Sequence, residues 1–211
     1  MNAKDGPIEL SARDLLLFRG ERCLLDGVSF SIGTGEGIAL RGPNGTGKTT
    51  LLRVLCGLTE AEEGAVYWQG TDIRRQRQLW QAALGWSGHL NGFKADLTVD
   101  ENLAFYSSLY GQPDYALPPE LGLGDCISLP VRALSAGQKR RTSLAAVILG
   151  NSPVWILDEP YTNLDVQGID FLNQCLSRHI NGGGALIIAS HGNAHADLGI
   201  KELTLEQGQL S

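Results

Sequence analysis

A glycine-rich loop between a short apolar run and a helix is the feature that most constrains this chain. The loop, residues 42–49, reads Gly-Pro-Asn-Gly-Thr-Gly-Lys-Thr and directly follows the apolar run Gly37–Leu40. Glycines leave backbone N–H groups free to point inward, and the helix after the loop adds the positive end of its dipole. Because phosphates need many donors at short range, this arrangement predicts a cradle for a phosphate chain.

Two side chains of the loop have specific candidate roles. Lys48 supplies a cation for β- and γ-phosphates, and the Thr49 hydroxyl is a candidate ligand of Mg²⁺. A glycine-rich turn that merely caps a helix is the alternative, and the order of strand, loop, lysine, threonine and helix disfavours it. The candidate nucleotide-binding residues here are Gly42, Pro43, Asn44, Gly45, Thr46, Gly47, Lys48, Thr49 and Thr50.

Two adjacent carboxylates end a second apolar run, Val154–Leu157. Asp158 fits a carboxylate that holds Mg²⁺ through water, and Glu159 fits a general base that polarises an attacking water. Taken alone, such a pair is more often a solvated acidic turn. Downstream of a phosphate loop, we expect the catalytic role instead, because buried carboxylates without a partner are costly.

The apolar runs also predict the fold class, which is α/β. Gly37–Leu40, Val154–Leu157 and Ala185–Ala189 are short and do not alternate with polar residues, as is typical of buried strands in a parallel sheet. Residues 8–32 alternate more and predict antiparallel strands joined by a turn near Arg19–Glu21. Leu203–Leu210 predicts a last hairpin.

The character of the chain changes between about residues 73 and 132. Gln76–Trp86 and Val99–Gly111 have helical spacing, and four prolines interrupt residues 113–130. We interpret the segment as a helical subdomain inserted between two halves of the sheet. The 211 residues are predicted to form a single domain, 1–211, with this subdomain at about 73–132.

Composition bounds the partners and the location. The net charge of −6 argues against nucleic acid as a partner. No apolar run approaches the ~20 residues that span a bilayer, and the first residues lack the layout of a secretory signal, so we expect the protein to remain where it is made. The cysteines, which are expected to be reduced, are Cys23, Cys56, Cys126 and Cys175.

A further motif precedes the acidic strand. Leu134–Gln138 reads Leu-Ser-Ala-Gly-Gln and opens a helix, for which Ser135 alone would be an ordinary N-cap. In order along the chain come the phosphate loop, the helical insertion, this motif, Asp158-Glu159, and a histidine after the next strand. The chain therefore resembles an ABC ATPase over nearly its whole length. The resemblance implies a P-loop NTPase core with a mixed sheet, an N-terminal antiparallel β subdomain and a helical insertion.

The resemblance also assigns roles. Ser135, Ala136, Gly137 and Gln138 match the family signature, which binds the γ-phosphate of ATP held by the opposite subunit; Ala136 replaces the usual glycine. Asp165, in Thr162–Asp165, matches a loop that shapes the dimer interface, and His191 matches a switch histidine that works beside Glu159 at the γ-phosphate.

Two positions depart from the family pattern. The register of Leu-Thr-Val-Asp-Glu-Asn, which begins at Leu97, puts His89 where the family has a glutamine that contacts water and Mg²⁺ and senses the membrane subunit. Imidazole can also meet a water, but it is shorter and sensitive to pH. The aromatic that stacks on adenine corresponds to Phe18 or Arg19, and either can contact a base through its ring or its cation.

Within the family, the chain is similar to the haem-exporter ATP-binding subunits of cytochrome c maturation. The similar segments are Leu134–Arg141, Tyr67–Gly70, Gly88-His89, Glu101–Tyr106 and Trp155–Pro160. This resemblance implies ATP and Mg²⁺ as cofactors, a homodimer formed on ATP binding, and integral membrane permease subunits as partners. It places the protein on the cytoplasmic face of the inner membrane, where hydrolysis would drive release of a haem-loaded chaperone, with haem not bound directly.

Three alternatives remain. The first is an ABC ATPase for another cargo, such as an importer or lipid exporter. The second is an ABC ATPase of DNA repair or translation, which would need a long coiled coil or a second ATPase half. The third is a self-contained P-loop kinase or GTPase, which would leave Leu134–Gln138 and His191 unexplained and would lack a guanine-reading Asn-Lys-x-Asp motif.

Overall fold

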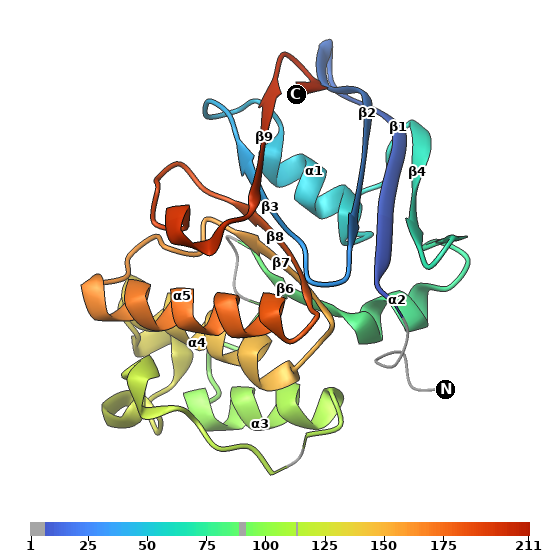
Figure 1. Cartoon of the computed structure of the whole chain (residues 1–211). Helices are drawn as coiled ribbons and strands as arrows, with labels where there is room; N and C mark the ends of the chain where they lie inside the picture. Colours follow the sequence, from blue (N-terminus) through green and yellow to red (C-terminus); the bar gives the residue numbers. More distant parts are fainter. Residues whose placement is uncertain (1–6, 89–91, 113) are drawn as a thin grey trace.

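The chain folds around two β-sheets, as a computed structural model that describes residues 7–88, 92–112 and 114–211 shows (Figure 1). One sheet has four strands in the order β2-β1-β4-β5, and the other has six in the order β10-β9-β3-β8-β7-β6. Helix α1, Lys48–Leu55, lies between the two sheets, and helices α3, α4 and α5 lie on the other side of the six-stranded sheet (Figure 1).

The four-stranded sheet is antiparallel and begins with the predicted hairpin. Strand β1, Glu9–Arg19, pairs with β2, Arg22–Gly33, across a turn in which Gly20 has a φ of 63°. Its remaining strands are β4, Glu63–Trp68, and β5, Thr71–Asp72. The predicted N-terminal antiparallel segment is therefore confirmed.

The six-stranded sheet contains every apolar run predicted as a buried strand. Its strands are β3, Gly37–Arg41; β6, Leu84–Ser87; β7, Val154–Asp158; β8, Ala185–Ala189; β9, Lys201–Glu206; and β10, Gln209–Leu210. All neighbouring pairs are parallel except β9 with β10, which form the predicted C-terminal hairpin. The α/β fold class with a mixed sheet is confirmed.

Both faces of the central strands are buried, which explains why their sequences do not alternate with polar residues. Ile156 and Ile187 pack into the core that contains α1, whereas Leu157 and Ile188 pack on the opposite face against Leu172 of α5. A strand covered on both sides must be apolar at consecutive positions.

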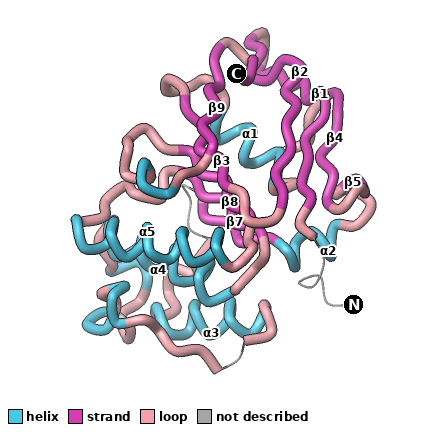
Figure 2. The backbone as a smooth tube through the Cα atoms, viewed as in Figure 1, coloured by secondary structure: helices cyan, strands magenta, loops and turns pink. Residues whose placement is uncertain are grey.

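The helices fall into two groups (Figure 2). Helices α1 and α2, Arg77–Ala83, accompany the two sheets, whereas α3, Val99–Leu109, lies outside α4, Ala136–Gly150, and α5, Val166–Asn181. A separate apolar cluster joins Leu103 of α3 to Leu121, Leu123 and Ala145. Short 3-10 turns occur at Pro119–Leu121, Gly124–Cys126, Val131–Ala133 and Ala196–Leu198.

One predicted helix was too long. The helical prediction for Gln76–Trp86 is right for Arg77–Ala83 but wrong for Leu84–Trp86, which begin strand β6 and pair with β7. Gly85 explains the close fit, because a Cβ there would lie 2.9 Å from Trp155 and 3.0 Å from Val147. The region 73–132 thus includes a strand of the main sheet, and β6 lies beside β7, the next strand along the chain.

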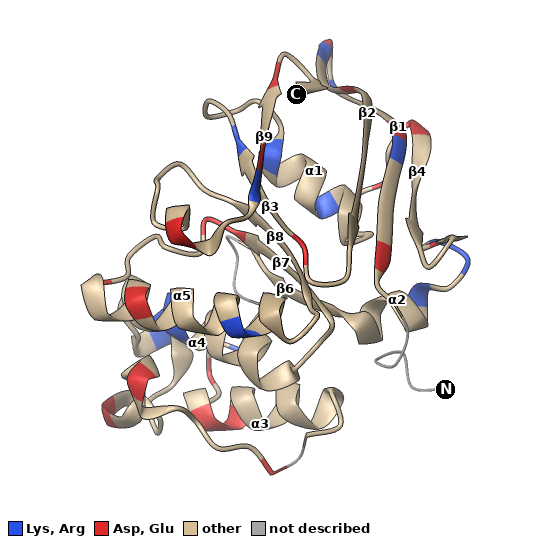
Figure 3. Ribbon diagram, in the orientation of Figure 1, with Lys and Arg blue, Asp and Glu red and all other residues tan. Residues whose placement is uncertain are grey.

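Acidic and basic residues are interspersed over both sheets and the helices (Figure 3). No helix in the described ranges is long and apolar enough to cross a membrane. All four cysteines lie in the described part of the chain, and each is a free thiol.

Candidate functional site

A cavity of about 750 Å³ opens at the carboxyl edge of the six-stranded sheet. It brings together the loop before α1, the end of β7 and the segment after β8, which are far apart in the sequence. The predicted residues in its lining are Phe18, Arg19, Asn44, Gly45, Gly47, Lys48, Thr49, Thr50, Glu159 and His191. One edge of the fold thus gathers residues of the phosphate loop with the predicted base, the switch histidine and the two candidates for contact with adenine.

The glycine-rich loop needs glycine at two positions for steric reasons. Gly42 and Gly47 have φ values of 136° and 108°, which side-chain-bearing residues rarely adopt. A Cβ at Gly42 would lie 2.2 Å from the Leu205 carbonyl oxygen, and one at Gly47 would lie 2.8 Å from that of Leu24. The loop is therefore pressed against β9 and β2, and its shape is fixed by backbone packing.

Lys48 is buried, although it is a lysine. Its Nζ donates to the carbonyl oxygens of Gly42, at 2.6 Å, and Pro43, at 2.9 Å. Burial lowers the pKa of Lys48, while the carboxylates of Glu159 and Asp158 raise it in opposition. The ammonium therefore lies inside the loop, next to the space where the phosphates are predicted to bind.

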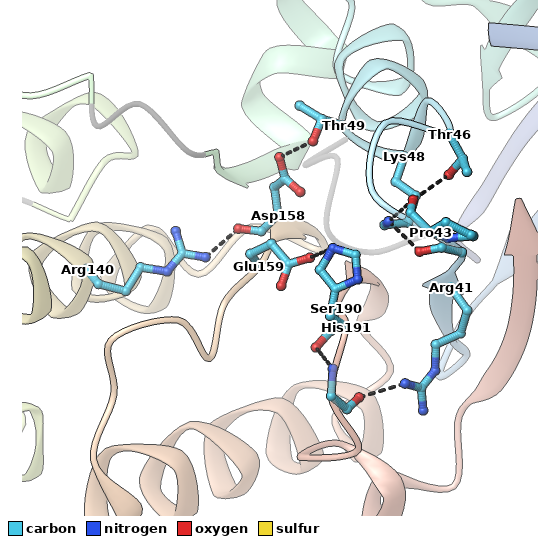
Figure 4. A network of polar contacts seen from close by, with 12 residues as sticks. Arg41, Pro43, Thr46, Lys48, Thr49, Arg140, Asp158, Glu159, Ser190 and His191 are labelled. Carbon is cyan, nitrogen blue, oxygen red and sulfur yellow. Dashed lines mark hydrogen bonds and ion pairs between the residues drawn. The ribbon is translucent and has the colours of Figure 1, made fainter.

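Thr49 and Asp158 meet although they are 109 residues apart. The Thr49 hydroxyl donates to Asp158 Oδ2 at 2.9 Å, which links the start of α1 to the end of β7 (Figure 4). A hydroxyl beside a buried carboxylate is a set of oxygen donors, which suits a hard cation such as Mg²⁺. The residues present therefore fit the predicted metal.

Glu159 and His191 face each other across the same edge. His191 Nε2 lies 3.2 Å from Glu159 Oε1 (Figure 4). Glu159 has a φ of 50°, an unfavourable value for a residue with a side chain, and its N–H donates to the Ala189 carbonyl oxygen at 2.8 Å. The bond to the end of β8 helps to hold the glutamate in this conformation, and the predicted base and switch histidine form a pair.

The loop after His191 is tied to the strand before the phosphate loop. Arg41, the last residue of β3, donates to the Gly192 carbonyl oxygen at 2.7 Å and to Asn193 Oδ1 at 2.8 Å. It also forms an ion pair with Glu202 at 2.7 Å. Sequence reasoning missed Arg41, although its place between a buried strand and the phosphate loop was a signal.

The signature surface, Ser135–Gln138, begins helix α4. Ser135 is its N-cap: its hydroxyl accepts from the Gln138 N–H at 3.2 Å, and its own N–H donates to Gln138 Oε1 at 2.9 Å. This reciprocal capping box fixes the turn. A Cβ on Gly137 would lie 2.8 Å from the Asn163 carbonyl oxygen, so the loop Thr162–Asp165 packs directly on the signature surface.

Asp165 connects this loop to two helices. Its Oδ1 accepts from the Gly168 N–H at 2.9 Å, which caps α5, and its Oδ2 pairs with Arg141 of α4 at 2.7 Å. These two interactions lower the pKa of Asp165. The loop and the signature helix are therefore held together within one chain.

The structure does not bring the signature surface into the cavity. Among the described residues that line the cavity, none belongs to Ser135–Gln138, and Asp165 is also absent. Ser135 and Ala136 are exposed. The predicted phosphate contacts of this surface cannot be made to the same chain's cavity in this conformation.

The other predicted residues are Phe18 and Arg19, as candidates for contact with adenine, and His89. Phe18, which is 41% exposed, and Arg19 both lie on the cavity wall, so either is placed to contact a base. His89 lies outside the described residues, and its role stays a prediction.

Comparison with known proteins identifies the family of the chain. The ABC transporter family matches residues 25–162, which include the phosphate loop, the signature surface and the Asp158-Glu159 pair. The chain belongs to the ABC transporter family.

Comparison with individual bacterial proteins identifies a narrower group of relatives. The chain is 44% identical to the cytochrome c biogenesis ATP-binding export protein CcmA of Yersinia pseudotuberculosis over 86% of this chain and 85% of that protein. It is 42% identical to the protein of the same name in Escherichia coli K12, over 94% and 97%. An ATP-binding subunit of an ABC transporter has the same fold, with a TM-score of 0.84 over 95% of this chain and 87% of that one, at 24% identity.

Proposed function

We propose that this chain is the ATP-hydrolysing subunit of an ABC transporter and that it works as a dimer. The observation that carries the proposal is the cavity, where the phosphate loop, the Thr49–Asp158 pair and the Glu159–His191 pair meet at one edge of the sheet. The chemistry is attack of a water on the γ-phosphorus of ATP, with the P–O bond to ADP broken and inorganic phosphate released.

The phosphate loop binds and orients the nucleotide. Backbone N–H groups at the start of α1 face the phosphate chain, and Lys48 exchanges its bonds to the Gly42 and Pro43 carbonyl oxygens for phosphate oxygens. The base of the nucleotide lies against Phe18 or Arg19. Thr49 and Asp158 would hold Mg²⁺, which when bound neutralises charge on the phosphates.

Glu159 and His191 prepare the attacking water. The Glu159 carboxylate accepts a hydrogen bond from the water and takes its proton, and His191 holds the carboxylate from the other side. The backbone bond from Glu159 to Ala189 keeps this geometry before substrate arrives. Glu159 therefore supplies the base, and His191 positions its carboxylate.

A second copy completes the site. The signature surface is exposed and lies outside its own chain's cavity, and it offers a helix N-terminus that suits an anionic γ-phosphate. ATP then joins two copies, each contributing a phosphate loop to one site and a signature surface to the other. A fold neighbour supports this arrangement: it is described as a dimeric post-hydrolysis state of an ATP-binding cassette bound to ADP and Pi, with a TM-score of 0.82 at 21% identity.

The cargo is haem in cytochrome c biogenesis. The support is the name of the bacterial relatives, cytochrome c biogenesis ATP-binding export protein, at 42–44% identity over most of the chain. The chain acts peripherally on the cytoplasmic face of the inner membrane beneath permease subunits and does not bind haem itself. A groove of about 430 Å³ supports the docking of a membrane subunit; it is lined by Cys56, Leu58, Gln78, Gln81, Ala82, Leu84, Trp86, Leu109 and Tyr110.

The test of the hydrolytic mechanism is Glu159→Gln. We expect hydrolysis to fall by about 10³-fold, because the proton acceptor is lost, and the variant to dimerise only with Mg-ATP in light scattering. Glu206→Gln, at an exposed glutamate on β9, is the matched control and should behave as wild type. A Glu159→Gln variant that stays monomeric while the wild type hydrolyses ATP would contradict the shared site.

The test of the cargo is genetic replacement. The chain is expressed in a bacterium that lacks its own CcmA, and covalently haem-bound c-type cytochromes are measured by haem staining. Restored staining with the wild type, and none with Glu159→Gln, supports the haem assignment. Wild-type ATP hydrolysis without restored staining favours another cargo.

A further inference from the structure

Helix α4 carries a buried arginine to which the sequence motifs assign no role. Arg140 is only 8% exposed, and it lies one turn after the signature surface. Its guanidinium donates to the carbonyl oxygens of Asp158, Pro160 and Gly88 and to the Ser87 hydroxyl (Figure 4 shows the bond to Asp158). All four acceptors are uncharged groups, so Arg140 is bound to backbone and hydroxyl oxygens at the ends of β6 and β7.

Two of these acceptors bracket Glu159. The Asp158 and Pro160 carbonyl oxygens belong to the residues on either side of the glutamate, whose φ of 50° is unfavourable. An unfavourable backbone conformation persists when its surroundings over-determine it. Arg140 donates hydrogen bonds to the backbone on both sides of this residue, and the Glu159 N–H donates to the Ala189 carbonyl oxygen.

The geometry suits arginine in particular. A guanidinium is planar and presents several N–H groups in fixed directions, so one side chain can bridge two strand ends. Burial lowers the pKa of Arg140 to about 10, against the carboxylates of Asp158 and Glu159, and the group remains a cation. A lysine offers a single ammonium point and cannot reproduce this spread of donors.

We propose that Arg140 is a positioning residue that locks the Glu159 backbone to the helix bearing the signature surface. The proposal rests on the proposed function, in which Glu159 serves the chain's own nucleotide and Ser135–Gly137 contact the partner's nucleotide. Arg140 therefore joins the base of the chain's own site to the helix whose first turn serves the partner's site.

Arg140→Lys in the full-length protein tests this, with two readouts. We expect kcat for ATP to fall by about tenfold while KM changes by less than about twofold, because the base is misplaced and the nucleotide-binding loop is intact. In nucleotide-free protein, hydrogen exchange at the amides within residues 159–162, which are those of Glu159, Tyr161 and Thr162, is expected to be faster by about tenfold, whereas exchange in α1 and β3 stays unchanged.

Ser143→Ala is the matched control. Ser143 lies on the same buried face of α4, and its hydroxyl shares a hydrogen bond of 2.8 Å with that of Ser87, which is also an acceptor of Arg140; the bonds to the carbonyl oxygens of Asp158 and Pro160 come from Arg140 and are kept in this variant. Its kcat and its exchange at 159–162 should match the wild type. Arg140→Gln, which keeps a planar donor group but loses the cation and reach, serves as the second variant if Arg140→Lys does not fold; it should show the same kcat and exchange changes.

The outcomes separate the inference from the function on which it rests. Wild-type kcat in a folded Arg140→Lys protein, or a lower kcat without faster exchange at 159–162, overturns the positioning role. If Glu159→Gln, assayed in parallel, abolishes hydrolysis while both Arg140 variants are normal, only the inference fails. If Glu159→Gln retains hydrolysis, the proposed function fails as well.

Discussion

The cavity and the signature surface differ in how their polar groups are satisfied. In the cavity, Lys48 bonds to its own loop, Thr49 to Asp158, and Glu159 to His191. At the signature surface, Ser135 and Gln138 bond to each other in the capping box, and Ala136 is exposed. In the cavity, the bonds occupy groups that are proposed to bind phosphate and cation, whereas at the signature surface they form a capping box at an exposed helix end.

The difference indicates what each region must do when nucleotide arrives. The cavity must exchange bonds: Lys48 leaves two carbonyl oxygens for phosphate oxygens, and the Thr49–Asp158 bond opens to admit a cation. At the signature surface, the capping box has already formed the first turn of α4 before nucleotide arrives. One chain therefore carries a cavity that rearranges and a signature surface that is preformed. This combination suits a site to which two copies of the chain contribute.

Lys48→Met is expected to have the largest effect on the cavity side. ATP affinity should fall by about 100-fold, because a buried cation that faces the phosphates is lost. Fluorescent nucleotide titration measures this, with Lys201→Met, an exposed lysine on β9, as the matched control. Unchanged affinity in Lys48→Met would mean that the cavity does not bind nucleotide through this lysine.

Gly137→Ala should have a smaller effect, and it should lower kcat instead of ATP affinity. The added Cβ meets the Asn163 carbonyl oxygen at 2.8 Å, so the loop Thr162–Asp165 must shift. We expect kcat to fall by about tenfold, with ATP affinity of the single chain unchanged. Loss of nucleotide binding in the isolated chain would contradict the separation of the two regions.

Mixing these two variants tests the comparison directly. A mixed dimer of Lys48→Met and Gly137→Ala chains holds one site with both defects and one with an intact loop and an intact signature surface. An equal mixture should recover about one quarter of the wild-type rate, since half of randomly paired dimers are mixed and each has one good site. A rate equal to the mean of the separate variants would show that each chain works alone.

The two regions also differ in how far the sequence predicted them. The buried strands, the hairpins at both ends of the chain and the order of the loops followed from local patterns at Gly37–Leu40, Val154–Leu157 and Ala185–Ala189, because these strands are covered on both faces. The end of α2 did not follow. Leu84–Trp86 continues a helical pattern, and only pairing with β7 makes it a strand.

The side chains that support the site were harder to find. Arg41 binds the Gly192 carbonyl oxygen, 151 residues away in the sequence, and Arg140 binds the Ser87 hydroxyl, 53 residues away, as well as three carbonyl oxygens. Backbone acceptors have no signature in side-chain identity. Arg140 did leave a trace, because it shares a helix face with the buried Leu144 and Val147. A charged residue on an apolar helical face indicates a buried partner, but it does not say which.

Asp165→Asn tests the link between the signature helix and its neighbouring loop. The folded pKa of Asp165 is lowered below the ordinary value of 3.8 by the Gly168 N–H and Arg141, so the charge stabilises the fold above that pH. Stability from this group is lost as pH falls through the folded pKa. We therefore expect Asp165→Asn to melt at a lower temperature than wild type at neutral pH, with the difference shrinking below pH 3.8.

Calorimetry or circular dichroism across pH measures this difference. Asp197→Asn, at an exposed aspartate in the turn Ala196–Leu198, is the control and should melt as the wild type does. A difference for Asp165→Asn that is constant down to low pH would assign the effect to side-chain shape instead of charge.

The smallest effect is expected at Ala136, where the chain has a methyl group at the first position of α4. Ala136→Gly should change kcat by less than about twofold, since the exposed first turn is held by its capping box and glycine costs at most ~1 kcal/mol within a helix. Ala136→Val tests the opposite direction: a larger side chain on a surface that closes against the partner's phosphates should lower kcat without changing ATP affinity. Steady-state hydrolysis and nucleotide titration measure both. If valine is as harmless as glycine, the surface is not pressed against a ligand during turnover, and the contrast between a rearranging cavity and a preformed partner surface would have to be abandoned.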